Sequence, residues 1–149
     1  MDKLIMNRYY RKLKYANLEI DLEFKSELTI ICGDSAVGRT FIYNLLSEEP
    51  SKDKIIFINY LTPSDILEYI VLSGKIKNRL IVIDNVDILL SEERVVNGIR
   101  NDNSNQYIVM MRKYDSLAKS QKNIARLIRR ENRLVLYYTL LENFYLYEE

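Results

Sequence analysis

The chain has 149 residues, of which 48% are hydrophobic and 29% charged, and 22 Lys+Arg against 21 Asp+Glu give a net charge of +1. This length suits one domain with one sizeable core, and the composition excludes a disordered or collagen-like chain. The near-neutral charge excludes a generally basic protein, so whole-chain charge predicts neither nucleic-acid nor membrane binding.

Residue usage excludes further classes of site. Cys32 is the only cysteine and histidine is absent. This excludes an intramolecular disulfide framework, a cysteine-rich zinc site and histidine acid–base chemistry. The first eight residues lack the apolar core of a signal peptide, and no apolar run approaches the ~20 residues of a transmembrane helix. We therefore expect a cytoplasmic protein that does not enter a membrane.

The first elements follow from apolar periodicity. Residues 18–24 alternate apolar and acidic side chains, which predicts a strand with one wet face. A short turn at 25–27 leads to the apolar run 28–32, typical of a strand buried on both faces. The short turn favours an antiparallel strand at the N-terminal edge of the sheet. Apolar residues at helical spacing then predict a helix over 40–47.

Two further buried strands, 55–58 and 80–83, flank a predicted helix. Thr62 would cap this helix, Pro63 would take its first position and Gly74 would end it. The side chains expected to be buried by it are Ile66, Leu67, Ile70 and Val71.

The last third of the chain continues this alternation. We predict a short helix from Ser91 to about Arg100, a strand over 107–111, a helix over 116–130 and a strand over 134–138. Strands separated by helices predict an α/β fold: a mostly parallel sheet of about five strands flanked by helices, with an antiparallel N-terminal edge strand.

The chain is expected to be a single domain, because no linker or repeat divides it. Residues 1–27 would form the N-terminal β edge, 28–138 the core, and 139–149 an apolar and acidic tail. That tail would fold back onto its own sheet or pack against a second subunit.

The segment between the first buried strand and the first helix carries the strongest motif. It reads Gly33-Asp34-Ser35-Ala36-Val37-Gly38-Arg39-Thr40 and matches the phosphate-loop pattern G-x-x-x-x-G-K-[ST] except at Arg39. Glycines let the backbone N–H groups converge on phosphate oxygens, and a helix N-terminus adds positive potential there. Arg39 would meet the terminal phosphates, and the Thr40 hydroxyl would bind Mg²⁺.

A second element of the same site is the strand 80–83 followed by Asp84. Its carboxylate emerges at the carboxyl end of a buried strand, where a Mg²⁺ site beside a phosphate loop requires it. Thr40 and Asp84 are 44 positions apart, which leaves room for a helix, a strand and another helix. We therefore expect ATP or GTP along residues 33–40, with Mg²⁺ between Thr40 and Asp84.

Residues 16–112 resemble a P-loop NTPase, with a Walker A-like loop at 33–40 and a Walker B-like strand at 80–84. Residues 16–40 resemble the opening of ABC-type and RecF/SMC-like ATPase heads. The run Asp84-Asn85-Val86-Asp87 resembles the acidic run closing the Walker B strand in STAND-type and AAA+-type ATPases. The resemblance implies a P-loop NTPase-like fold and a site for a nucleotide with Mg²⁺.

Departures from this pattern predict slow or absent hydrolysis. Arg39 replaces the lysine of the family, and its planar fork is larger than an ammonium group. Asn85 stands where many such ATPases carry an acid that activates water, so a general-base role would fall to Asp87. Arg112 follows the strand 107–111, where related ATPases carry a residue that senses the terminal phosphate; alternatively it is a solvated strand-end arginine.

The net charge conceals two locally basic stretches. Residues 8–15 interleave basic and tyrosine side chains, as in surfaces that contact phosphate backbones and stack on bases. The predicted helix over 116–130 would carry one basic stripe at spacings of three and four. This stripe consists of Lys119, Lys122, Arg126, Arg129, Arg130 and Arg133.

The stripe supports a second hypothesis about function. It would contact nucleic acid or an acidic protein surface, or it is only a solvated helix face. In this alternative, the chain is a non-catalytic P-loop-like binding protein, such as a phage or mobile-element factor that engages a host nucleoprotein. The partner and the oligomeric state stay open.

Overall fold

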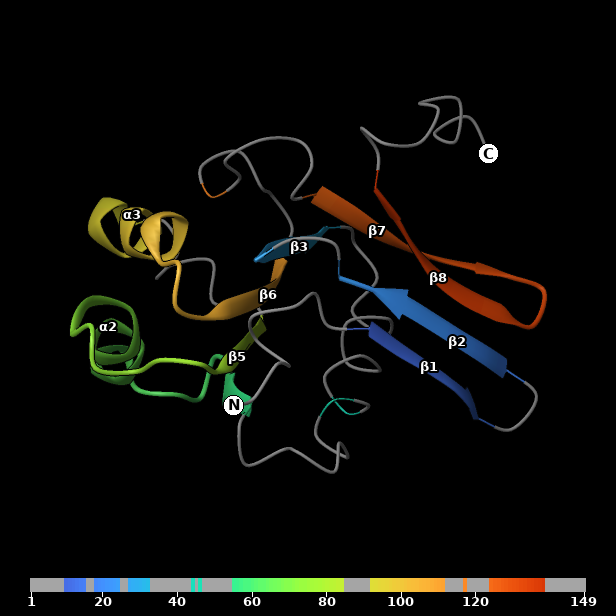
Figure 1. Cartoon of the computed structure of the whole chain (residues 1–149), viewed down its shortest axis with the longest axis horizontal. Helices are drawn as coiled ribbons and strands as arrows, with labels where there is room; N and C mark the ends of the chain where they lie inside the picture. Colours follow the sequence, from blue (N-terminus) through green and yellow to red (C-terminus); the bar gives the residue numbers. More distant parts are fainter. Residues whose placement is uncertain are drawn as a thin grey trace.

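The structure is a computed structural model that describes residues 10–15, 18–24, 27–32, 44, 46, 55–84, 92–111, 117 and 124–138. These residues form one sheet and two helices (Figure 1). The elements are β1 (Tyr10–Tyr15), β2 (Leu18–Glu23), β3 (Leu28–Cys32), β4 (Ile55–Ile58), α2 (Ser64–Leu72), β5 (Leu80–Asp84), α3 (Glu93–Asn101), β6 (Gln106–Met111), β7 (Ile124–Arg130) and β8 (Arg133–Tyr138).

The sheet of the described residues has eight strands in the order β1-β2-β8-β7-β3-β6-β5-β4. Neighbouring strands are parallel except in the β1–β2 and β7–β8 pairs. Both helices connect parallel neighbours, α2 between β4 and β5 and α3 between β5 and β6. The prediction of an α/β fold with a mostly parallel sheet is confirmed, with more strands than the expected five.

The prediction that residues 18–24 form the edge strand is wrong. β2 pairs antiparallel with β1 and parallel with β8, so the edge belongs to β1, a strand that the sequence analysis missed. The alternation itself was interpreted correctly, because Ile20 and Leu22 are fully buried while Asp21 is partly exposed. Alternation identifies the buried face of a strand but not its neighbours in the sheet.

The predicted helix over 116–130 is also wrong, because residues 124–130 form β7. This strand pairs antiparallel with β8 through a two-residue turn, and it pairs parallel with β3 from Ile30–Ile124 onward. The hairpin register places Leu127 opposite Leu136, so apolar contacts between strands replace those expected along a helix face. Non-local pairing of this kind overrides local helical periodicity.

The basic stripe therefore does not exist as a helix face, since a strand repeats every two residues rather than every 3.6. Arg126 lies in β7 and is exposed. Arg133 begins β8 and forms an ion pair with Asp21 of β2, with 3.0 Å between Nη2 and Oδ2. Lys119 and Lys122 lie outside the described residues, as do the side chains of Arg129 and Arg130.

Helix α2 lies close to the predicted range but begins differently. Pro63 is its N-cap, and the Thr62 hydroxyl accepts a hydrogen bond from Asn59 N (3.1 Å) in the preceding turn instead of capping the helix. Gly74 has φ of +72°, a conformation that costs glycine little, and follows the helix end as expected. Ile66 is 45% exposed, contrary to the prediction that it is buried.

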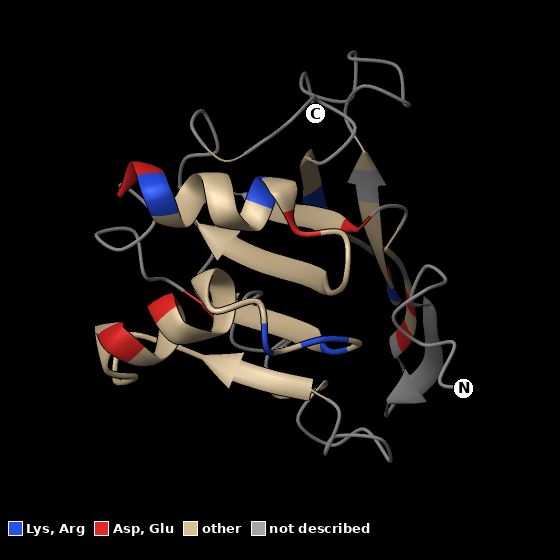
Figure 2. Ribbon diagram, turned by 60° about the vertical axis from the view of Figure 1, so that its left-hand side comes forward, with Lys and Arg blue, Asp and Glu red and all other residues tan. Residues whose placement is uncertain are grey.

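Buried side chains fill both faces of the sheet. On β5, Ile81 and Ile83 belong to one cluster and Leu80 and Val82 to the other. The first cluster contains the buried side chains of α2 and α3, which lie side by side on that face (Figure 2). The second contains side chains of β2 and Leu46. Burial on both faces explains why the central strands are continuous apolar runs.

Close contact between α2 and α3 depends on Gly98. A Cβ added there would lie well inside the van der Waals contact distance of Val71 Cγ1, and 2.9 Å from Leu72 Cδ2. Val71 is buried, so it cannot move aside freely. An ion pair from Arg94 Nη2 to Glu68 Oε1 (2.6 Å) also joins the helices, but exposed pairs contribute only about 0.2–1 kcal/mol.

We predict that Gly98→Ala lowers the free energy of unfolding by about 1–2 kcal/mol, because the overpacking outweighs the better helix propensity of alanine. Urea denaturation followed by circular dichroism measures this change. Asn97→Ala, at the neighbouring exposed position of α3, is the control and should leave stability unchanged or raise it. Equal stability of Gly98→Ala and wild type would contradict the proposed contact.

Candidate functional site

The carboxyl ends of three neighbouring strands lie level with one another. β6 lies between β3 and β5, and its register aligns Cys32 of β3 with Met111 and Asp84 of β5 with Met110. Neighbouring strands are about 4.8 Å apart, so the Cα atoms of Cys32 and Asp84 are about 10 Å apart. β3, β5 and β6 therefore end at the same edge of the sheet. These three strand ends hold or lead into the predicted phosphate loop, the predicted Mg²⁺ ligand and the predicted phosphate sensor.

The connections from β3 and β6 lead in opposite directions along the sheet. From β3 the chain passes β6 and β5 to reach β4, whereas from β6 it passes β3 in the opposite direction to reach β7. Connections that leave neighbouring parallel strands in opposite directions define a topological switch point. Ligands of open α/β sheets bind outside the carboxyl ends of the strands at such a point.

Among the predicted catalytic and metal-binding residues, Asp84 alone lies in the described part of the chain. It ends β5 and is partly exposed. Because side chains alternate along a strand, it lies on the same face as Leu80 and Val82. Residues 33–40, which follow Cys32 directly, lie outside the described residues, and so do Asp87 and Arg112. Within the described residues, no three metal-ligating side chains gather into a cluster.

Arg126 also lies at this edge of the sheet, although the sequence predicted it on the basic stripe of a helix. It stands next to Cys32 in the parallel register of β7 with β3, and its side chain is exposed. β7 continues for four residues past this level, to Arg130. The structure thus places a cation on the strand beside the start of the predicted phosphate loop. The sequence has no local signal for this placement, because apolar residues at helical spacing predict a helix over 116–130, and a helix would not place Arg126 in the sheet.

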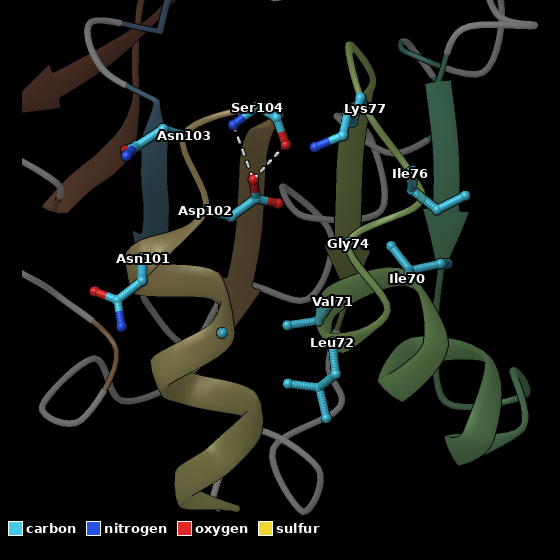
Figure 3. A pocket seen from close by; sticks show the side chains of 11 residues that line it. Ile70, Val71, Leu72, Gly74, Ile76, Lys77, Asn101, Asp102, Asn103 and Ser104 are labelled. Carbon is cyan, nitrogen blue, oxygen red and sulfur yellow. Dashed lines mark hydrogen bonds between the residues drawn. The ribbon is translucent and has the colours of Figure 1, made fainter.

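A separate pocket lies at the opposite end of the sheet, where α2 and α3 lead into the amino ends of β5 and β6 (Figure 3). Its volume is about 470 Å³. The residues lining it are Ile70, Val71, Leu72, Gly74, Ile76, Lys77, Gly98, Asn101, Asp102, Asn103 and Ser104. Because it opens at the amino ends of the strands, it is not part of the switch-point site.

Asp102 is the polar centre of this end of the molecule. Its Oδ1 accepts hydrogen bonds from Ser104 N (2.8 Å) and Ser104 Oγ (2.7 Å), the two contacts drawn in Figure 3. Its Oδ2 accepts hydrogen bonds from Asn105 Nδ2 (2.8 Å) and the Tyr107 hydroxyl (2.6 Å). Burial acts to raise the pKa of Asp102, but these bonds to the carboxylate outweigh burial and lower the pKa.

The same network ties two loops together. Burial, with the bond to Asp102 next in size, raises the pKa of Tyr107 far above its usual range, so its hydroxyl remains a donor. Asn105 Nδ2 also donates to Ile76 O (2.8 Å), and Asn105 Oδ1 accepts from Arg79 N (2.9 Å). Four protein donors occupy the Asp102 carboxylate, so its role is to fix the loop before β6. Asn105, held by Asp102, joins this loop to the loop before β5.

We predict that Asp102→Asn destabilises the protein by about 1–2 kcal/mol at pH 7. The side-chain NH2 group of the asparagine is a donor and would lie against groups that are themselves donors. The lowered pKa of Asp102 means that its stabilisation is present above pH ~4 and is lost as the pH falls through the folded-state pKa. Urea midpoints at pH 7 and pH 2.5 should therefore differ more in wild type than in Asp102→Asn.

Tyr107→Phe is the matched control for this prediction, since it removes one of the four bonds and leaves the carboxylate in place. It should cost less than Asp102→Asn and keep the acid dependence of wild type. If wild type and Asp102→Asn lose stability equally between pH 7 and pH 2.5, the carboxylate does not carry this stabilisation.

In the described parts of the chain, no helix is both long enough and apolar enough to cross a bilayer. Comparison with protein families, curated proteins and solved structures finds no match to this chain.

Proposed function

We propose that this chain is a minimal P-loop nucleotide-binding protein that takes ATP or GTP with Mg²⁺ and hydrolyses it slowly or not at all. The observation that carries the proposal is the register of β3, β6 and β5, which places Cys32 and Asp84 within one residue of the same level at a topological switch point. The glycine-containing segment 33–40 and the carboxylate of Asp84 thus start from the same edge of the sheet.

The position of Asp84 fits a role at a metal ion. A separation of about 10 Å between the two strand ends leaves space for a phosphate chain and one Mg²⁺ between the loop and the carboxylate. In this arrangement Thr40 and Asp84 would hold Mg²⁺, and the backbone N–H groups of residues 33–40 would bind the phosphates. Mg²⁺ would neutralise phosphate charge at that point.

A buried helical residue supports the P-loop fold that the proposal requires. Leu46 lies in the core cluster on the face of the sheet toward which Asp84 is directed. The predicted helix over 40–47 would begin with Thr40, so its position on this face would bring Thr40 and Asp84 together. With α2 and α3 on the other face, such a helix would give a sheet flanked by helices on both sides, as the proposal requires.

Slow hydrolysis follows from two residue types. Arg39 replaces the lysine that meets the terminal phosphates, and Asn85 replaces the acid that would activate water. These features favour binding of the nucleotide over its turnover.

We expect ATP or GTP at 1 mM with 5 mM Mg²⁺ to raise the thermal midpoint of wild type. A ligand present at about 100 times its Kd adds about 2.7 kcal/mol, which corresponds to several degrees for a domain of this size. Asp84→Ala should lose the Mg²⁺-dependent part of the shift. Differential scanning fluorimetry with and without EDTA measures both effects.

Glu19→Ala is the matched control, since it removes an exposed carboxylate from β2, away from the carboxyl ends of β3 and β5. It should bind nucleotide like wild type. The absence of any Mg²⁺-dependent shift with either nucleotide in wild type would overturn the proposal.

A further inference from the structure

Helix α2 and the turn before it carry a concentration of exposed large apolar side chains. We call this set the apolar ridge; its members and exposed fractions are Tyr60 (73%), Leu61 (74%), Ile66 (45%), Tyr69 (51%) and Leu72 (40%). Single exposed apolar residues are common on protein surfaces, but five large ones on one helix and the turn before it are typical of an interface.

The helical part of the ridge has the geometry of a helix-packing surface. Ile66, Tyr69 and Leu72 are three residues apart, so they form one row across the outer side of α2. Leu72 ends this row next to α3, where its Cδ2 also lies against Gly98. The buried side chains of the helix, such as Leu67 and Ile70, face the sheet. α2 therefore has two apolar rows, and within the part of the chain that the structure describes only the inner one is buried.

The turn before α2 presents the other two members in a fixed conformation. Asn59 O accepts a hydrogen bond from Thr62 N (3.0 Å), and Asn59 Oδ1 accepts one from Leu61 N (2.9 Å). The bond from Asn59 N to the Thr62 hydroxyl closes the turn further. A turn fixed by three hydrogen bonds displays Tyr60 and Leu61 at little cost in conformational entropy on binding.

Charge along α2 indicates what covers the ridge. Asp65 lies in the first turn of the helix, whereas the exposed Lys75 and Lys77 follow its end. A second copy of α2 running antiparallel would place the acidic end of each helix against the basic end of the other. Ile66 and Leu72 are each three residues from Tyr69 along α2, so a twofold axis at Tyr69 would place Ile66 of one copy against Leu72 of the other.

We propose that a second copy of this chain covers the apolar ridge, in a homodimer that packs the α2 helices antiparallel about a twofold axis near Tyr69. An interface of this kind is isologous, because the same patch is used on both copies. The five side chains expose on the order of 500 Å² per copy, taking about 200 Å² for a fully exposed large apolar residue. Two copies would bury about 1,000 Å² from the ridge alone, the lower range of specific interfaces.

Sedimentation velocity between about 1 and 500 μM tests the proposal, and we expect a reversible monomer–dimer equilibrium in wild type. Tyr69→Glu should weaken dimerisation at least 100-fold, because it places two carboxylates at the axis. Asn132→Glu adds the same charge at the exposed β7–β8 turn and should dimerise like wild type. Circular dichroism checks that each variant is folded.

Charge exchange then tests the antiparallel arrangement. Asp65→Lys alone and the Lys75→Asp, Lys77→Asp pair alone should each weaken the dimer about tenfold or more, and the triple variant should recover wild-type affinity. Recovery of affinity in the triple variant would show that two copies of this chain contact each other, because no other partner would carry the compensating substitutions. A wild-type monomer throughout the concentration range, a dimer insensitive to Tyr69→Glu, or no recovery in the triple variant would overturn the proposal.

Discussion

The parallel alignment of β3, β6 and β5 is the constraint on which the rest of the structure depends. Their register brings Cys32 level with Met111 and Asp84 level with Met110, although these residues are far apart in sequence. Side chains of all three strands are buried on both faces, so a shift by one residue would exchange the two core clusters. The packing that stabilises the sheet thereby also fixes the positions at its carboxyl edge.

The two ends of the sheet have different roles. At the amino ends of β5 and β6, Asn105 joins the two loops through side-chain hydrogen bonds and Asp102 holds Asn105, so the connections are fixed there. At the carboxyl ends, connections diverge from a switch point, where the proposed nucleotide would meet the segment 33–40 and the carboxylate of Asp84. The proposed dimer surface on α2 belongs to neither end, so nucleotide binding and self-association would use separate surfaces.

Local pattern predicted the central strands well because each is short, apolar and buried on both sides. The runs 28–32, 55–58, 80–83 and 107–111 all form strands of the central sheet. Prediction failed over 124–130, where Ile124, Leu127 and Ile128 fit helical spacing but pair with other strands instead. The stop of α2 at Gly74 was predictable from the residue alone, whereas the role of Thr62 in the preceding turn was not.

The sequence by itself determined the α/β class, the central strands, the phosphate-loop-like motif and Asp84 as a strand-end carboxylate, because these depend on residue type and local spacing. Tertiary structure decided which strands are neighbours, that β1 and not β2 forms an edge, and that Arg126 stands beside Cys32. It also decided which side of α2 stays exposed. These outcomes depend on pairing between distant segments, and local periodicity carries no information about the partner of a strand or helix face.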